Sequence, residues 1–174
     1  AEHYLPTGPE SEVPASLVGA YLSIVDKADA LAGCFGLNMI PTGTQDPYAL
    51  RRQALGIVRT AWEHRLRFSL DSLLDRAFDA YQGVAWKLDK EAALSALREF
   101  FAHRIRALCT GQGIGTRVVD AALNVGFDDL WAFEQRLQAL ERFSRESDFD
   151  QAVLTFKRAD NIIRKQGDQA GVDL

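Results

Sequence analysis

Cationic side chains recur at helical spacing in the C-terminal stretch "FKRADNIIRK". This strip carries a net charge of +3 over about two helical turns, at roughly 5.4 Å per turn, and Asp160 is its one acid. That scale suits contacts to successive nucleic-acid phosphates, so the pattern is consistent with a nucleic-acid-binding face. A solvated basic face near a helix C-terminus, which the helix dipole favours, is an equal alternative. The predicted contact residues are Lys157, Arg158, Asn161, Arg164 and Lys165. Arg104 and Arg106, in the stretch "AHRIRALC", are predicted to extend the strip.

A second charged constellation joins two neighbouring segments. Asp26 and Asp29 in "VDKAD" lie three residues apart and share a helix face, and Arg51 and Arg52 stand near the start of the next predicted helix. Because buried carboxylates need partners, we predict ion pairs across this helix hairpin, with metal binding by the aspartates as the weaker alternative. Gly56 lies between two arginines of the second helix and predicts a close approach, either by a neighbouring helix or by a nucleic-acid backbone.

Other residue types capable of chemistry give no catalytic pattern. The three histidines share no metal-ligand spacing, and no nucleophile or acid–base pair stands out, so the sequence predicts neither catalytic residues nor a metal site. The motif "GQGIG" superficially resembles a phosphate-binding loop, but a helical pattern precedes it, which favours a helix end. Cys34 and Cys109 are predicted to be free, buried thiols.

The elements that must position these residues are all helical, because apolar residues recur with a helical period almost throughout. We expect an all-α protein with helices that begin near Pro14, Pro47, Ser69, Asp89, Thr116, Leu130 and Ser147. In the first helix, the predicted inward residues are Leu17, Tyr21, Ile24, Ala28 and Leu31. In the last helix they are Val153, Phe156 and Ile163. Residues 83–88 are the best candidate for a domain boundary, because they are short and non-periodic.

Composition and charge narrow the class of protein. The chain has 174 residues, of which 47% are hydrophobic and 25% charged, and no apolar run is long enough to span a bilayer. A net charge of −4 argues against a wholly basic nucleic-acid binder, but the charge is unevenly distributed. Residues 1–45 hold five acids and one base, whereas residues 46–68 hold five arginines and two acids. The N-terminus "AEHYLPTGPE" has no initiator Met, and we expect it to lie inside a longer protein.

Several long motifs match a known family. The stretch "IVDKADALAGCFGLNMIPTGTQDPYALRRQALGIVR" resembles the beta subunit of bacterial glycine–tRNA ligase, in which an ADKLD-type helix precedes a PTGSKDPFALRR-type segment. The stretches "LREFFAHRIRALCTGQGIGTRVVDAAL" and "FDQAVLTFKRADNIIRK" resemble the C-terminal region of the same subunit. The resemblance extends from about Glu2 to Lys165 and implies a C-terminal fragment of that subunit.

The resemblance implies a cytoplasmic, two-subunit synthetase that uses ATP and Mg, whose alpha subunit activates glycine and whose beta subunit supports tRNA recognition. It implies no cofactor in this fragment, with glycine tRNA and the alpha subunit as partners and neither membrane nor DNA binding. Residues 1–68 would complete an HD-like helical domain and residues 69–88 would form a helix and connector. Residues 89–167 would form a helical anticodon-binding domain, followed by a flexible tail at 168–174. Asp26 matches a metal-ligand position of HD-type hydrolases, although the HD pair has no counterpart here.

Three functions follow as hypotheses. The leading one is a tRNA-binding module that supports attachment of glycine to its tRNA. The second is a remnant HD-type metal phosphohydrolase, which would depend on Asp26. The third is a purely structural scaffold for assembly of the two subunits.

Overall fold

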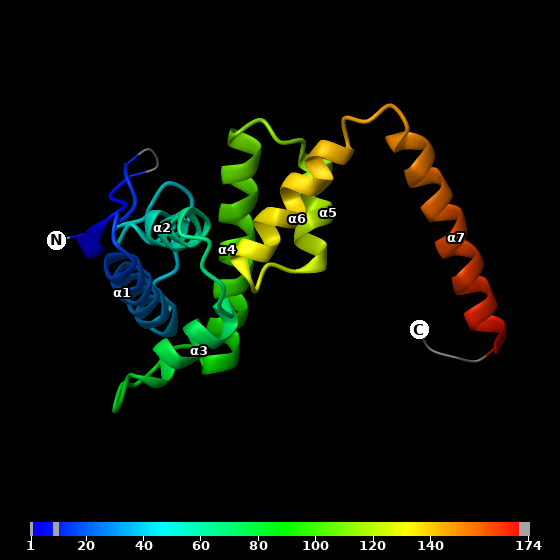
Figure 1. Ribbon diagram of the computed structural model, residues 1–174. Coiled ribbons are helices and arrows are strands. Elements are labelled where there is room, and N and C mark those ends of the chain that lie inside the picture. Colours follow the sequence, from blue (N-terminus) through cyan, green and yellow to red (C-terminus); the bar gives the residue numbers. More distant parts are fainter. Residues whose placement is uncertain (1, 9–10, 171–174) are drawn as a thin grey trace. The chain divides into compact units, whose positions relative to one another are not determined.

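A computed structural model describes residues 2–8 and 11–170, and the side chains of 164–170 lie outside the described part. Helices are the regular elements of these residues, with a bridge between Thr42 and Gln45, and the all-α prediction is confirmed (Figure 1). The elements are the 3-10 helix η1 (Glu2–Tyr4) and the α-helices α1 (Leu17–Gly36), α2 (Leu50–Glu63), α3 (Leu70–Asp79), α4 (Lys90–Gly111), α5 (Thr116–Val125), α6 (Leu130–Phe143) and α7 (Phe149–Ala170).

Helices begin where a side chain accepts hydrogen bonds from the unpaired N–H groups of the first turn. Ser69 and Asp89 cap α3 and α4 as predicted, through contacts to the amides of Ser72 (3.0 Å) and Ala92 (2.8 Å). The expected start of α1 near Pro14 is corrected, because Ser16 is the capping residue and its hydroxyl accepts from the Gly19 amide.

The start of α2 lies three residues further along the chain than predicted. The helix begins at Leu50 rather than at Pro47, because Ala49 adopts a left-handed conformation with φ of 54°. The carboxylate of Asp46 nevertheless reaches forward and accepts from the amides of Leu50 (2.7 Å) and Arg51 (3.0 Å). Asp46 therefore caps the helix as expected, but from further upstream.

Two compact units divide the chain, residues 1–137 and residues 138–174. In the first unit α1 packs against η1, α2, α3 and α4, and a continuous apolar core extends from Ala20 to Leu137 (Figure 1). In the second unit the rings of Phe143 and Phe149 meet edge to face at the start of α7, with centroids 5.2 Å apart.

Residues 83–88 do not separate two cores within the first unit. The ring of Trp86 packs against Phe78 with centroids 4.5 Å apart, and the amides of Lys87 and Leu88 donate to the carbonyl of Gly36 at 2.9 and 3.1 Å. The segment is non-periodic because it lies across α1, and a packed connector gives the same sequence signal as a linker. The assignment of residues 89–167 to a separate domain stays a prediction.

The motif "GQGIG" ends α4, as the preceding helical pattern indicated. Gly113 has a φ of 87°, a region that favours glycine, and the amide of Ile114 returns to the carbonyl of Cys109. Thr116 then begins α5, which ends at Val125 before Gly126. The glycines therefore serve helix termination.

Candidate nucleic-acid interface

Helix α7 presents the predicted basic strip to solvent. The side chains of Lys157, Arg158 and Asn161 are exposed, whereas those of Arg164 and Lys165 lie outside the described residues. Positions 157, 158 and 161 fall within one sector of a helical wheel at 100° per residue. The charges of Lys157 and Arg158 and the amide of Asn161 are therefore available to a polyanion on one side of the helix.

The apolar side of α7 corrects a prediction. Val153, Phe156 and Ile163 were expected to face a core, but Phe156 is 71% exposed and Ile163 54% exposed, while Val153 is half-buried. None of the described α7 side chains is fully buried. Amphipathic periodicity identifies an apolar face without specifying what covers it, and this is why the inward assignment was wrong.

Arg104 of α4 is half-buried and lies against other α4 and α2 groups. Its guanidinium carbon is 5.6 Å from the centroid of the Phe100 ring, and its Nε is buried with no hydrogen-bond partner among the described residues. Burial, and then the nearby Arg51, lower the pKa of Arg104. The Asp46 carboxylate at the start of α2 partly offsets both effects on this pKa.

Arg106 of α4 has a structural partner instead. Its Nε donates to Oδ1 of Asp120 at 2.6 Å, and this ion pair joins α4 to α5. Both side chains are roughly 40% exposed, so the pair is screened by water. Arg104 and Arg106 therefore contact different neighbours and do not form one strip on α4.

The predicted ion pairs between the aspartates of α1 and the arginines of α2 do not form among the described residues. Arg51 donates to the carbonyl of Gly43 at 2.7 Å, and Asp29 accepts from the hydroxyl of Tyr81 at 3.1 Å. Asp26, Asp29 and Arg52 instead line a shallow depression of about 420 Å³. Asp26 and Asp29 are exposed, so they do not need the charge partners that burial would require.

Lys27, which lies between the two aspartates, is the residue that sequence reasoning missed. It is only 4% exposed, and its Nζ donates to the carbonyls of His3 (3.2 Å) and Leu5 (2.9 Å) and to Ser23 Oγ (2.8 Å). Burial lowers the pKa of Lys27. The lysine therefore ties the N-terminal segment to α1, and only its position on the core side of the helix could have signalled this.

Gly56 confirms the predicted close approach by packing within the protein. A Cβ at this position would lie 2.7 Å from Cε of Lys27, so the glycine makes room for the lysine stem. Arg59, one turn further along α2, donates to the carbonyls of Gly8 (2.9 Å) and Ser11 (2.7 Å). This part of the arginine face of α2 therefore holds the N-terminal segment.

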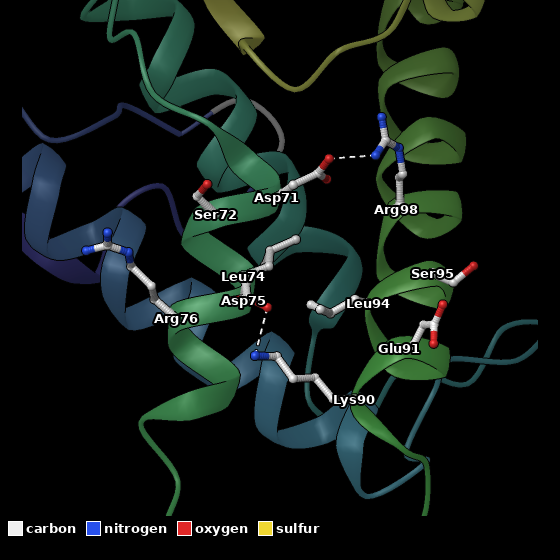
Figure 2. Close-up of a pocket in the computed structure, with 10 residues that line it drawn as sticks. All are labelled: Asp71, Ser72, Leu74, Asp75, Arg76, Lys90, Glu91, Leu94, Ser95 and Arg98. Carbon is white, nitrogen blue, oxygen red and sulfur yellow. Dashed lines mark hydrogen bonds and ion pairs between the residues drawn. The ribbon is translucent and has the colours of Figure 1, made fainter.

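A groove between α3 and α4, with a volume of about 930 Å³, is a second concave feature (Figure 2). Leu74 and Leu94 contribute its apolar part. Arg98 reaches across to Asp71 at 2.5 Å, and Lys90 lies 2.7 Å from Asp75, as Figure 2 shows. Because carboxylates already neutralise these two cations, the groove offers little attraction to phosphate.

Residues suited to metal or thiol chemistry do not gather into a site. The described residues contain no cluster of three or more His, Cys, Asp or Glu side chains that could hold a metal ion. Burial raises the pKa of Cys34 and raises that of Cys109 to about 11, so both thiols are poorly reactive. His64 lies 2.6 Å from the carbonyl of Pro14. The phosphohydrolase centred on Asp26 stays a hypothesis.

None of the helices in the described part is both long enough and apolar enough to cross a membrane.

Comparison with known proteins identifies the family. Residues 1–124 match the family model for the glycyl-tRNA synthetase beta subunit. The chain is 59% identical to the glycine–tRNA ligase beta subunit of Solidesulfovibrio magneticus over 174 residues, which are all of this chain and 25% of that protein. It is 59% identical over 169 residues to the Oleidesulfovibrio alaskensis protein of the same name and 44% identical over 174 residues to that of Lawsonia intracellularis. The chain spans about a quarter of the length of these relatives. It belongs to the glycyl-tRNA synthetase beta-subunit family.

Proposed function

We propose that this chain is the tRNA-binding part of a glycine–tRNA ligase beta subunit. In this role it supports ATP-dependent attachment of glycine to its tRNA, while a partner alpha subunit activates the amino acid. The observation that carries the proposal is the exposed basic sector of α7 in a member of this family. Exposed cations at helical spacing supply the phosphate contacts that dominate the affinity of RNA-binding proteins.

Lys157, Arg158 and Asn161 contact the tRNA backbone first in this proposal, and Arg164 and Lys165 continue the strip. Phosphate contacts position an RNA without reading its sequence, so choice of the correct tRNA requires further contacts to unpaired bases. Arg104 assists through its guanidinium, whose Nε is buried with no hydrogen-bond partner among the described residues. Arg106 contributes less, since Asp120 already neutralises it.

The domain assignments belong to the same proposal. Residues 1–68 complete an HD-like domain, 69–88 form a helix and packed connector, and 89–167 form the anticodon-binding-like region, with 168–174 as a tail. The whole synthetase works in the cytoplasm with ATP and Mg, and this part of it binds neither.

A charge-reversal experiment tests the proposal directly. The double variant Lys157→Glu with Arg158→Glu is compared with wild type for binding of a glycine tRNA transcript by fluorescence anisotropy over a salt series. We expect at least a tenfold loss of affinity, and a slope of log K against log salt that is shallower by about two, because two phosphate contacts are lost. Both side chains are exposed, so the fold is expected to persist.

The matched control reverses two exposed cations outside the strip, Lys87→Glu with Arg117→Glu. It changes the net charge equally, so a non-specific charge effect would weaken both variants alike. The control is expected to bind within about twofold of wild type, because the salt-dependent contacts are local. Equal losses in both variants, or no loss in the α7 variant, would refute the assignment to α7. Transcripts with a substituted anticodon then report whether this part reads sequence.

A further inference from the structure

Helix α1 carries an apolar stripe on the side away from its core. Its members are each more than half exposed: Leu17 (56%), Val18 (69%), Tyr21 (55%), Leu22 (55%) and Val25 (55%). They occupy adjacent positions over about two and a half turns, so together they form one surface rather than scattered apolar residues. Contiguous exposed apolar surfaces of this kind mark contacts with other polypeptide.

Further along α1, the side of the helix that carries the stripe is covered by another segment of the chain. Helical spacing continues from Val18 and Leu22 through Asp29 to Gly33 and Gly36. A Cβ at Gly33 would lie 2.6 Å from the Tyr81 hydroxyl, and one at Gly36 would overlap the ring of Trp86. The connector between α3 and α4 thus packs on the same side of α1 in the C-terminal half of the helix. The exposed stripe lies on this side in the N-terminal half and continues an existing packing surface.

Charge around the uncovered half defines what fits it. Asp26 and Asp29 are exposed at its border, and the one base among residues 1–45, Lys27, is buried. Tyr4 (65% exposed) and Tyr48 (51%) line the depression that holds the two aspartates, together with Arg52. An apolar segment with a lysine or arginine at its edge would satisfy both the stripe and the acidic border.

The size of the surface distinguishes a tethered occupant from a free one. Five such side chains expose on the order of 500 Å², about the largest patch usual on a monomer. A stable complex between separate proteins buries about 800 Å² on each partner. A segment of the same polypeptide needs less, because the tether supplies a high effective concentration. Relatives of this chain are about four times as long, so most of the family subunit lies outside these residues.

We infer that the α1 stripe is the docking surface for an apolar, basic-edged segment of the remaining three-quarters of the beta subunit. Pairing with a second copy of this chain is disfavoured by charge. In an antiparallel pair the acidic end of one α1, with Asp26 and Asp29, would meet the other end, where the Glu2 carboxylate contacts Ser16.

Cysteine accessibility tests this inference without tRNA. Leu22→Cys is introduced into the 174-residue chain and into a full-length beta subunit. The full-length protein is the Solidesulfovibrio magneticus relative in which this chain replaces the matching residues. Maleimide labelling is expected to be at least tenfold slower in the full-length subunit. Val125→Cys, on α5, is the matched control, because Val125 is 71% exposed and is expected to label at similar rates in both proteins. Buried Cys109 reports folding, since it labels rapidly only when the core opens.

Each other result overturns the inference. Equal labelling of Leu22→Cys in both proteins, with Cys109 protected, means that the rest of the subunit does not cover the stripe. Protection that appears only after the alpha subunit is added assigns the surface to that partner. Slower labelling at higher concentration of the 174-residue chain assigns it to a second copy.

Discussion

Helices α1 and α7 have similar lengths, 20 and 22 residues, but different relations to a core. Helix α1 buries eleven residues and still exposes an apolar stripe on its other side. Helix α7 buries none of its described side chains and has a basic sector beside an exposed apolar one. Apolar periodicity is present in both helices, so this pattern measures only the capacity of a helix to pack. It does not show where the packing partner is.

The largest expected effect contrasts one phenylalanine from each helix. Phe35 of α1 is fully buried and meets Phe100 edge to face with centroids 5.2 Å apart. Phe35→Ala should lower the free energy of unfolding by about 3–5 kcal/mol, through lost transfer energy and a residual cavity. Phe156→Ala in α7 should change it by less than about 0.5 kcal/mol. Urea unfolding followed by tryptophan fluorescence measures both, and comparable losses would show that α7 shares a core.

Removing the buried lysine of α1 should have the next largest effect. Lys27→Met keeps most of the stem, but leaves the carbonyl of His3 without the donor seen at 3.2 Å. An unsatisfied buried polar group costs about 1–3 kcal/mol, and we expect a loss of that size in the free energy of unfolding. Amide hydrogen exchange should rise in residues 2–8 while the core of α4 stays protected. Uniform loss of protection would contradict a local role.

The same lysine gives a pH dependence whose sign is fixed. Because burial lowers the pKa of Lys27 in the folded state below its ordinary 10.5, the unfolded chain binds more protons between these two pKa values. The free energy of unfolding attributable to Lys27 therefore rises as pH increases through this window. Lys27→Met lacks this rise, so its loss of stability relative to wild type should grow with pH there. Burial and Asp29 raise the pKa of Tyr81 to about 12 in the folded protein. The contribution of Tyr81 cancels when the free energies of unfolding of wild type and Lys27→Met are subtracted.

The glycine of α2 gives a smaller effect. Gly56→Ala gains helix propensity but places a Cβ 2.7 Å from Lys27 Cε and 2.9 Å from its Cδ, so the lysine stem must shift. We expect a net loss of about 1 kcal/mol from this overpacking. Gly111→Ala, where a Cβ meets nothing within 4 Å, is the matched control and should be neutral or stabilising. A stabilising Gly56→Ala would show that the Lys27 contact is loose. Thermal unfolding of the pair gives the comparison.

How much the sequence predicts depends on the range of the interaction. The predicted caps at Ser69 and Asp89 are confirmed because each capping side chain and the amide that donates to it are only three positions apart. The inward face of α1 is only partly correct, since Leu17 and Tyr21 are exposed whereas Ile24 is buried. That helix is apolar on both sides, so the phase of its pattern is ambiguous.

Long-range contacts were the harder part of the candidate site. The close approach at Gly56 follows from the cost of a helical glycine, but its partner, Lys27, is 29 positions away and belongs to a helix whose rotation was uncertain. Because the rotation of this helix is ambiguous, the sequence predicts ion pairs for Asp26 and Asp29, which face outward. It does not predict the buried position of Lys27 between them. The exposed basic face of α7 needed only local periodicity, and its contact with RNA stays a prediction.

The smallest expected effect separates structural from RNA-binding arginines. A double-mutant cycle on Arg106→Ala and Asp120→Ala should give a coupling of about 0.2–1 kcal/mol that decreases with added salt, as for other half-exposed ion pairs. Arg158→Ala, at an exposed position of α7, should leave stability unchanged and weaken tRNA binding more than Arg106→Ala does. If Arg106→Ala instead weakens tRNA binding more than Arg158→Ala at equal stability, α4 rather than α7 carries the RNA contact. The cycle therefore separates an arginine that holds two helices together from one whose charge remains available to a phosphate.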